Sequence, residues 1–342
     1  MAIWETMKRL WSIYNRAIEI DKNFAPAYFS RGFLFGKKMR HEEALADYQK
    51  ALDIDPNYKE AYGNRAKLFM NKGDYEKALA DFNKAISLDD KSSDYRLGRG
   101  IVYRKQKNYA GALADFNAVI AMKPNSFEAY TNRGQIFRDQ GDQVRAIEDL
   151  SKAIEINPGD VKIYIMRADI LKGRGERTKA IADYSMAIKI DSRSARAYSA
   201  RGSVHFSLGD LQPALDDLNR AIELDPNYPN AYQIRGTLHG RSGNLLQSLS
   251  DFNKAVELEP NNPSFYIARG FTFFSMNNLD NALIDYNKAL EINPNIALTY
   301  QNRGNLFGRR KEVVMACSDW KRACELGACI NYTQAQKSGE CR

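Results

Sequence analysis

The sequence lacks a long apolar run. Hydrophobic residues make up 44% of its 342 residues, but no stretch reaches the roughly 18 consecutive apolar residues that a membrane-spanning helix needs. The first residues, MAIWETMKRLWSIY, carry too much charge for the apolar core of a signal peptide. We therefore expect a folded protein without a membrane span.

Histidine is scarce, and the sequence motifs that mark catalytic or cofactor sites are absent. The chain has three histidines, and it contains no glycine-rich phosphate loop, no metal motif and no nucleophile–base pair at a recognisable spacing. An enzyme needs a pocket with several convergent titratable groups. The sequence therefore predicts neither an enzyme nor a bound cofactor.

The net charge of +8 does not come from one basic region. Cations exceed acids in residues 93–126, 161–194 and 297–342, whereas residues 127–160 are net negative. A nucleic-acid-binding surface needs clustered Lys and Arg on one exposed face. This distribution disfavours a nucleic-acid partner, and nucleic-acid binding stays open as an alternative.

One sequence pattern recurs along nearly the whole chain, and residues 127–160 show it clearly. Tyr130 and Phe137 lie on one face of a first helix, because they are two helical turns apart. Ala146 and Leu150 share one face of a second helix for the same reason. The pattern predicts a helical hairpin with one buried seam, which needs neighbouring hairpins to cover its other apolar edge.

The ends of the two helices are marked in the sequence. Gly141 suits a helix terminus that requires a positive φ, and Asp142 can cap the next helix. Pro158 cannot continue a helix, so each unit ends there. Gly134 leaves room for the two helices of the hairpin to approach closely.

This pattern resembles the tetratricopeptide repeat (TPR) family. The family's spaced aromatic, small and proline positions read here as Tyr130-x2-Arg133-Gly134-x2-Phe137, Ala146-x3-Leu150 and Pro158. The resemblance covers residues 25–328 and implies an all-α, right-handed superhelical solenoid of nine helical hairpins. Residues 1–24 align with the second helix of a unit and predict an N-terminal capping helix, and residues 329–342 form a C-terminal tail.

TPR proteins generally hold peptides or partner proteins in a concave groove lined by their first helices. The resemblance therefore implies a non-catalytic interaction scaffold with a protein or peptide partner and without a cofactor. A self-assembling solenoid is a further alternative. Trp4 and Trp11 lie on one side of the first helix, where they either pack against the first full repeat or form an exposed patch for self-association.

One departure from the family recurs in every unit, where Arg stands in place of the usual Leu. An Asp follows in the second helix of the same unit, as Asp149 follows Arg133, and both positions lie beside core residues, where an unpaired charge is costly. We predict a ladder in which each Arg pairs with this Asp or with the Asp of the preceding unit, which for Arg133 is Asp115. The arginines are Arg31, Arg65, Arg99, Arg133, Arg167, Arg201, Arg235, Arg269 and Arg303.

The groove positions of the family map onto polar residues here. Arg104, Arg138 and Lys172 occupy equivalent positions of three consecutive units, and a concave surface would focus their field. This arrangement suits an acidic partner segment with apolar residues beside it, whereas the alternative is a row of solvated cations, with Asp169 neutralising part of the charge. The carboxylate clamp of some family members does not match, because its first lysine falls at Gly63 or Thr131. The mapped groove residues are Asn64, Lys67, Arg104, Lys105, Thr131, Asn132, Gln135, Arg138, Asp169 and Lys172.

All four cysteines lie near the C-terminus. Cys329 and Cys341 flank the segment INYTQAQKSGE, and we predict a disulfide between them that pins the tail over the final helix. Such a bond would favour an oxidising compartment, such as the periplasm or the extracellular space, over the cytoplasm. The alternative is four reduced thiols, and the localisation is otherwise unknown.

Overall fold

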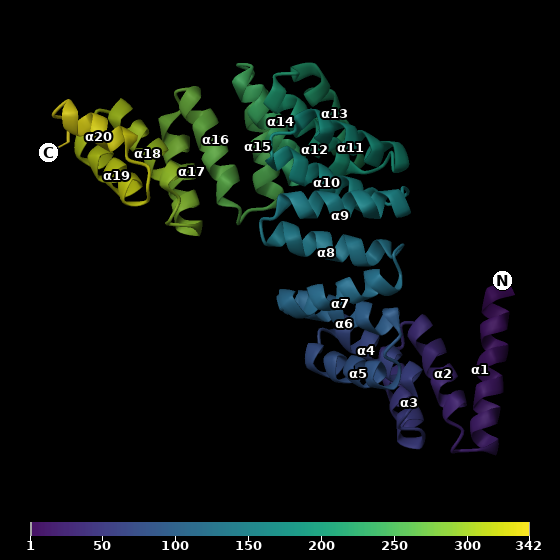
Figure 1. Cartoon of the computed structure of the whole chain (residues 1–342). Helices are drawn as coiled ribbons and strands as arrows, with labels where there is room; N and C mark the ends of the chain where they lie inside the picture. The colour runs from purple at the N-terminus through teal and green to yellow at the C-terminus, as the bar shows by residue number, and fades with distance from the viewer. Residues whose placement is uncertain (1, 342) are drawn as a thin grey trace. The chain divides into compact units, whose positions relative to one another are not determined.

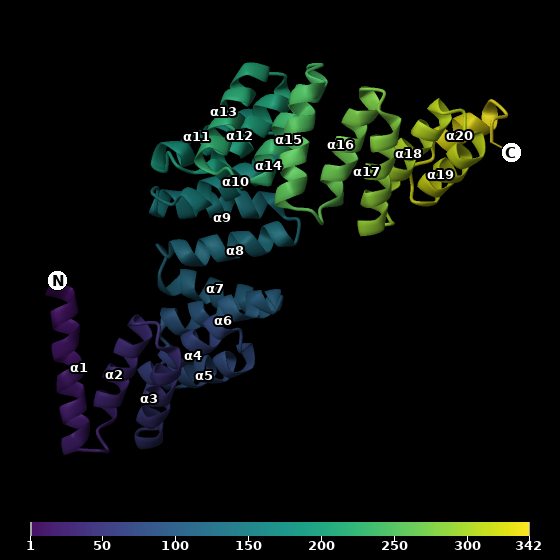
Figure 2. The same cartoon turned by 180° about the vertical axis from the view of Figure 1, so that it is seen from behind.

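The structure is a computed structural model that describes the backbone of residues 2–341 and the side chains of residues 9–341. This part of the chain consists of helices joined by short turns and contains no strand (Figures 1 and 2). None of these helices is long and apolar enough to cross a membrane. The chain divides into two compact units, residues 1–170 and 171–342, and each has its own set of packed hairpins.

The first unit contains one helix and four helical hairpins, followed by a helix that crosses the division between the units. Its helices are α1 (Ala2–Ile20), α2 (Ala25–Lys37), α3 (His41–Ile54), α4 (Lys59–Lys72), α5 (Tyr75–Leu88), α6 (Ser93–Lys105), α7 (Tyr109–Met122), α8 (Phe127–Asp139), α9 (Gln143–Ile156) and α10 (Val161–Gly173). Even-numbered labels from α2 to α18 mark the first helix of each repeat, and odd-numbered labels from α3 to α19 mark the second.

The second unit continues the same alternation and ends with a short additional helix. Its helices are α11 (Arg177–Ile190), α12 (Ala195–Leu208), α13 (Leu211–Leu224), α14 (Pro229–Arg241), α15 (Leu245–Leu258), α16 (Pro263–Ser275), α17 (Leu279–Ile292), α18 (Ala297–Arg309), α19 (Val313–Glu325) and α20 (Ile330–Lys337). The predicted all-helical fold of successive helical hairpins is thus confirmed.

The turn inside each hairpin contains one residue in the left-handed region. Gly141 has a φ of 81°, and Asp142 caps α9 by accepting a hydrogen bond from the backbone N–H of Arg145, as the sequence predicts. The same turn recurs in every repeat, although four of the nine left-handed residues are not glycine. These nine residues are Met39, Gly73, Lys107, Gly141, Gly175, Gly209, Gly243, Asn277 and Lys311.

Inside each hairpin, a small residue of the first helix packs against an alanine or serine and a larger residue of the second helix. Ala146 and Leu150 on α9 are fully buried, and Gly134 on α8 faces them. A Cβ atom at Gly134 would lie 3.2 Å from the Cβ of Asp149 and 3.3 Å from the carbonyl oxygen of Ala146. The helices therefore approach too closely for a larger residue at this position.

The predicted Arg–Asp ladder is present, and each pair joins the two helices of one hairpin. Arg133 donates from Nε and from one terminal nitrogen to the two carboxylate oxygens of Asp149, both at 2.8 Å. This bond raises the pKa of Arg133, while burial acts in the opposite direction. Eight such pairs are Arg31–Asp47, Arg65–Asp81, Arg99–Asp115, Arg133–Asp149, Arg201–Asp217, Arg235–Asp251, Arg269–Asp285 and Arg303–Asp319.

The alternative, in which each Arg pairs with the Asp of the preceding unit, is wrong for these eight arginines. The nitrogen that faces the preceding repeat donates to a different side chain there. The other terminal nitrogen of Arg133 donates to Asn117 Oδ1, at 2.6 Å, on the second helix of the preceding repeat. Each of these eight arginines thus connects three helices and fixes both the hairpin and its neighbour. The nine acceptors are Asn15, Gln49, Asn83, Asn117, Ser151, Ser185, Asn219, Asn253 and Asn287.

Helix α1 packs as the second helix of an incomplete repeat. Asn15 accepts a hydrogen bond from Arg31 at 2.9 Å, as the equivalent residues do in the later repeats. Ile13 stands where those repeats have a buried aspartate, and its side chain is 58% exposed. Trp11 is 40% exposed, whereas the side chain of Trp4 lies outside the described residues. Self-association through this helix stays a prediction.

The cysteine pairing differs from the prediction of a Cys329–Cys341 disulfide. Cys341 is bonded to Cys317, and Cys329 is bonded to Cys324. The cause is the path of the tail, because α20 turns back and packs on α19. Cys329 therefore lies near the end of α19 that it has just left, and Cys341 reaches back to the middle of that helix.

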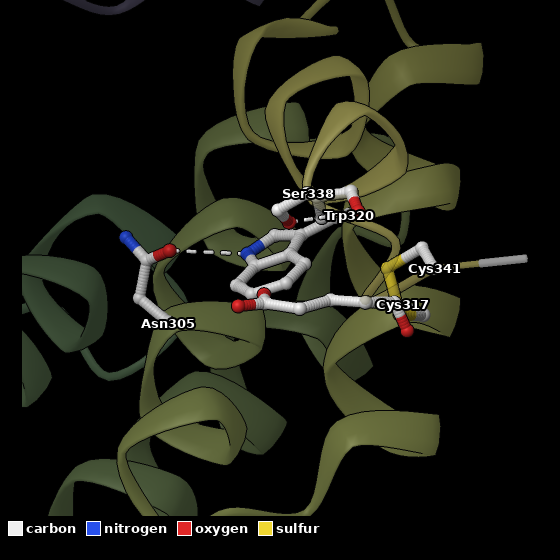
Figure 3. Close-up of a disulfide and its surroundings, with 7 residues drawn as sticks. Asn305, Cys317, Trp320, Ser338 and Cys341 are labelled. Carbon is white, nitrogen blue, oxygen red and sulfur yellow. Dashed lines mark hydrogen bonds between the residues drawn. A yellow bond between two sulfur atoms is a disulfide. The ribbon is translucent and has the colours of Figure 1, made fainter.

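The folded-back tail is also attached to the last hairpin by polar contacts. Figure 3 shows the Cys317–Cys341 disulfide near Trp320 on α19, whose Nε1 donates to Asn305 Oδ1 at 3.0 Å. The same oxygen accepts a hydrogen bond from Asn331 on α20, at 2.9 Å. Two disulfides, one at each end of α20, and this amide contact hold the tail on α18 and α19.

Candidate functional site

The residues mapped onto the family's groove all lie on first helices, which present one face away from their own second helices. Asn64 and Lys67 lie on α4, Arg104 and Lys105 on α6, Thr131, Asn132, Gln135 and Arg138 on α8, and Asp169 and Lys172 on α10. Nine of them belong to the first unit, whereas Lys172 belongs to the second. The structure therefore brings Arg104 and Arg138 together but leaves the position of Lys172 relative to them as a prediction.

Arg138 lies close enough to Arg104 for its charge to act on that guanidinium. Arg104 is half-buried, and among the described residues no hydrogen-bond acceptor pairs with its buried Nε. Burial lowers the pKa of Arg104, and the charge of Arg138 lowers it further, whereas Asp139 raises it. An arginine stays charged under such a shift. Arg104 thus offers a cationic donor that the fold itself leaves incompletely paired.

Asp139 changes the predicted charge balance of this surface. The sequence predicts a row of cations, Arg104, Arg138 and Lys172, that suits an acidic partner segment. However, Arg138 donates from one terminal nitrogen to Asp139 Oδ1 at 2.8 Å, and from Nε to the same oxygen at 3.1 Å. Both partners are exposed, so this pair is weak and a ligand carboxylate can compete for the guanidinium.

Two polar residues of α8 are partly engaged by their own helix. Thr131 Oγ1 donates to the carbonyl oxygen of Phe127 at 2.8 Å, and Asn132 Nδ2 donates to that of Glu128 at the same distance. These bonds use the Thr131 hydroxyl donor and one of the two amide N–H donors of Asn132. Thr131 can therefore still accept from a ligand, and Asn132 can both accept and donate.

Asn64 and Lys67 line a hollow between α2 and α4. Its wall also includes Phe33, which is 44% exposed, and Leu68. Lys37 lies over the Phe33 ring, 5.3 Å from its centroid. This end of the first unit thus combines ammonium groups with one exposed aromatic ring.

The remaining mapped residues differ in exposure. Gln135 and Asp169 are half-buried, and Lys105 and Lys172 are exposed at or near the ends of their helices. All four stay predictions as ligand-contacting residues.

A second surface, which is not among the sequence-based predictions, lies on the first helices of the second unit. Two hollows of about 470 and 450 Å³ lie on the two sides of Phe271 and share Ala268 and Phe271 as lining residues. The first hollow lies between α14 and α16, and the second extends to α18. A signal was available in the sequence, because Phe271 occupies the position of Gln135 and Gly240 occupies that of Arg138.

The hollow between α14 and α16 exists because small residues meet there. Gly240 stands where α12 has Phe206 and α16 has Phe274, and Ser248 replaces the alanine that follows the turn in the eight other repeats. Ser248 Oγ lies 3.2 Å from Thr272 Oγ1, and the Thr272 hydroxyl donates to the carbonyl oxygen of Ala268 at 3.0 Å. The two hydroxyls at the floor of this hollow are therefore hydrogen-bonded within the fold, and its walls combine the apolar residues Phe252 and Phe271 with Arg241.

Comparisons with known proteins agree with the repeat pattern. Models described as tetratricopeptide repeat match residues 25–58, 60–92, 97–161, 195–228, 229–262 and 263–296, and a model described as TPR repeat matches residues 168–209. The comparison with curated proteins finds no significant match.

Three solved structures share the fold at low sequence identity. A tetratricopeptide repeat protein from Parabacteroides merdae is 22% identical, with a TM-score of 0.59, over 69% of this chain and 93% of that one. PilF of Pseudomonas aeruginosa is 20% identical, with a TM-score of 0.56, over 64% of this chain and 98% of that one. The APC/C hetero-tetramer Cut9-Hcn1 is 13% identical, with a TM-score of 0.58, over 98% of this chain and 94% of that one. These similarities concern the fold alone.

Proposed function

Because the chain belongs to the tetratricopeptide repeat family, we propose that it is a non-catalytic scaffold that binds a segment of a partner protein on its first helices. Family membership supports a role in protein–protein interaction. The finer proposal is that the first unit binds an acidic segment through Arg104 and Arg138, with Lys67 and Lys105 nearby.

The observation that carries this proposal is the incomplete pairing of Arg104. The ladder arginines of the same helices are paired with carboxylates, as Arg99 is with Asp115. Arg104 instead has a buried Nε without an acceptor among the described residues and lies beside a second guanidinium. A buried donor without a partner costs free energy, and a carboxylate from a partner would recover it.

The test uses peptides selected by the protein itself. Random peptides displayed on phage are selected on the full chain, and the acidic peptides that emerge are measured by fluorescence anisotropy. Reversing Arg104, Arg138 and Lys172 to Glu should weaken their binding by about tenfold or more, because hot-spot cations are lost and repulsion is added.

The matched control reverses Lys50, Lys84 and Lys189, three exposed cations on second helices, so that the net charge changes equally. This control should leave the affinity nearly unchanged. Equal losses in both triple variants would mean a non-specific charge effect, and an unchanged affinity in the first variant would refute a role for these cations.

A further inference from the structure

The surface around Phe271 has a different chemistry from the cationic surface of the first unit. Phe271 is 55% exposed on α16, and Leu298 on α18 is 52% exposed beside it. Ile267 and Ile296 complete the apolar wall of the hollow between α16 and α18. Half-exposed rings and aliphatic chains that line hollows gain free energy when a ligand covers them, at roughly 25 cal/mol per Å² of buried apolar area.

The polar groups around this surface are of two kinds. Gln233 on α14 and Asn302 on α18 line opposite sides of the hollow that contains Ile267, and each amide can both donate to and accept from a peptide backbone. Arg241 lines the other hollow and lies over the Phe206 ring at 4.9 Å. None of the described residues that line the two hollows is acidic.

We propose that these hollows bind an extended segment of a partner protein that places one large apolar side chain on each side of Phe271 and an acidic residue beside Arg241. This inference rests on the proposed function and assigns the second unit its own ligand chemistry. The hollows are each large enough for a single side chain, and apolar anchors in such pockets dominate the affinity of many interfaces. The cation at one end and the amides at the other fix the direction and the extended form of the segment.

The experiment uses the peptides selected on the full chain and two variants that alter the surface in different ways. Phe271→Asp places a charge between the hollows. The double variant Gly240→Phe with Ser248→Ala fills one hollow with the Phe and Ala pair that the repeats of α12 and α16 already contain, so the helices are suited to accept it. Ile284→Asp, at a site 63% exposed on α17, is the control.

A class of peptides with large apolar residues next to Asp or Glu should emerge. Their affinity should fall by about tenfold or more in both hollow variants and by less than about twofold in the control. Arg241→Ala should weaken the same peptides by a smaller factor. Circular dichroism of each variant checks that the helices are intact.

Three outcomes would overturn the inference. If apolar peptides bind the Phe271→Asp variant as tightly as the wild type, the hollows are not their site. If every selected peptide is lost on reversal of Arg104, Arg138 and Lys172 and none on change of Phe271, the proposed function stands and this inference is wrong. If no peptide is enriched, both are wrong.

Discussion

The two units of this chain have nearly the same interior and very different first-helix surfaces. The Arg133–Asp149 pair of the first unit and the Arg235–Asp251 pair of the second have the same geometry, and each arginine also contacts an asparagine of the preceding second helix. By contrast, the equivalent position on the first helix carries Arg138 in α8 and Gly240 in α14. The residues that hold the repeats together are thus separate from the residues on the exposed face of the first helices. The chemistry of that face can therefore vary from repeat to repeat without loss of the fold.

The largest expected effect concerns the shared interior. Arg133→Leu leaves Asp149, which is 5% exposed, without its cation and should destabilise the α8–α9 hairpin by about 3 kcal/mol. We take the lower end of the range for buried pairs because the Arg133 side chain is 21% exposed. Arg235→Leu should have the same effect on α14–α15. Native-state hydrogen exchange of the amides in each hairpin measures both.

The double variants test whether the pair adds stability or mainly specifies register. Arg133→Leu with Asp149→Leu, and the equivalent pair in the second unit, should recover most of the stability, because no charge is left buried. Additive losses in the double variants would contradict pairing, and unequal losses in the two units would contradict the equivalence of their interiors.

The second prediction distinguishes the units by their disulfides, which occur only at the end of the second. Cys317→Ser with Cys341→Ser opens a loop with a sequence separation of 24 and should destabilise the α19–α20 region by about 3 kcal/mol in the chain-entropy model. Cys324→Ser with Cys329→Ser opens a loop with a separation of 5 and should cost about 2 kcal/mol.

Hydrogen exchange before and after treatment with a dithiol reductant checks this prediction. Protection should fall in α20 and the adjoining end of α19, while α4, α6 and α8 of the first unit stay unchanged, because each hairpin contacts only its neighbours. Unchanged protection of α20 after complete reduction would mean that the Trp320 and Asn331 contacts suffice to hold it.

The parts of the structure that the sequence predicts correctly are those that local chemistry decides. Gly141 and Asp142 specify their turn through positive φ and capping, and these requirements do not depend on distant residues. The partner of Arg133 is harder to predict, because the Asp of its own unit and the Asp of the preceding unit both fit the period. The third contact with Asn117 decides between them, and it is visible in sequence only as a polar residue that recurs at this position of the preceding second helix.

Features that depend on how segments fold back could not be predicted. Four cysteines allow three pairings, and the observed pairing follows from the reversal of α20, which the repeat pattern does not contain. The Arg138–Asp139 contact depends on side-chain rotamers rather than on spacing. The hollow between α14 and α16 exists because Gly240 has no side chain to fill it. Recurring charged residues in the sequence give no indication of such a hollow.

The two surfaces should also differ in how strongly salt weakens peptide binding to them. Binding of acidic peptides to the first unit should weaken by about tenfold between low salt and roughly 0.5 M NaCl, because exposed charges are screened within a few Å. Apolar peptides that bind beside Phe271 should change by less than about threefold, because burial of apolar surface is little affected by screening. Anisotropy titrations across the salt series measure both, and equal slopes for the two peptide classes would mean that they share one site.

The smallest expected effect is a stabilisation within the second unit. Tyr286 is fully buried, and its hydroxyl has no hydrogen-bond partner among the described residues. Equivalent positions of other repeats carry Phe82, Phe116 and Phe252, so Tyr286→Phe keeps the packing and removes an unsatisfied polar group. The variant should be more stable by about 1 kcal/mol at neutral pH.

The same substitution should change the response to alkaline pH. Burial raises the pKa of Tyr286 above its usual value, so the folded protein retains this proton at a pH where the unfolded chain, with a pKa near 10, has lost it. Stability contributed by the neutral phenol is therefore complete below pH ~10 and declines as the pH rises above it. Tyr286→Phe should reduce this decline, as measured by urea denaturation of the two proteins at pH ~8 and ~11. Tyr48, whose pKa burial raises to about 12, belongs to the first unit and keeps its own decline in both proteins. An equal loss of unfolding free energy between the two pH values in both proteins would show that the Tyr286 hydroxyl is solvated in solution.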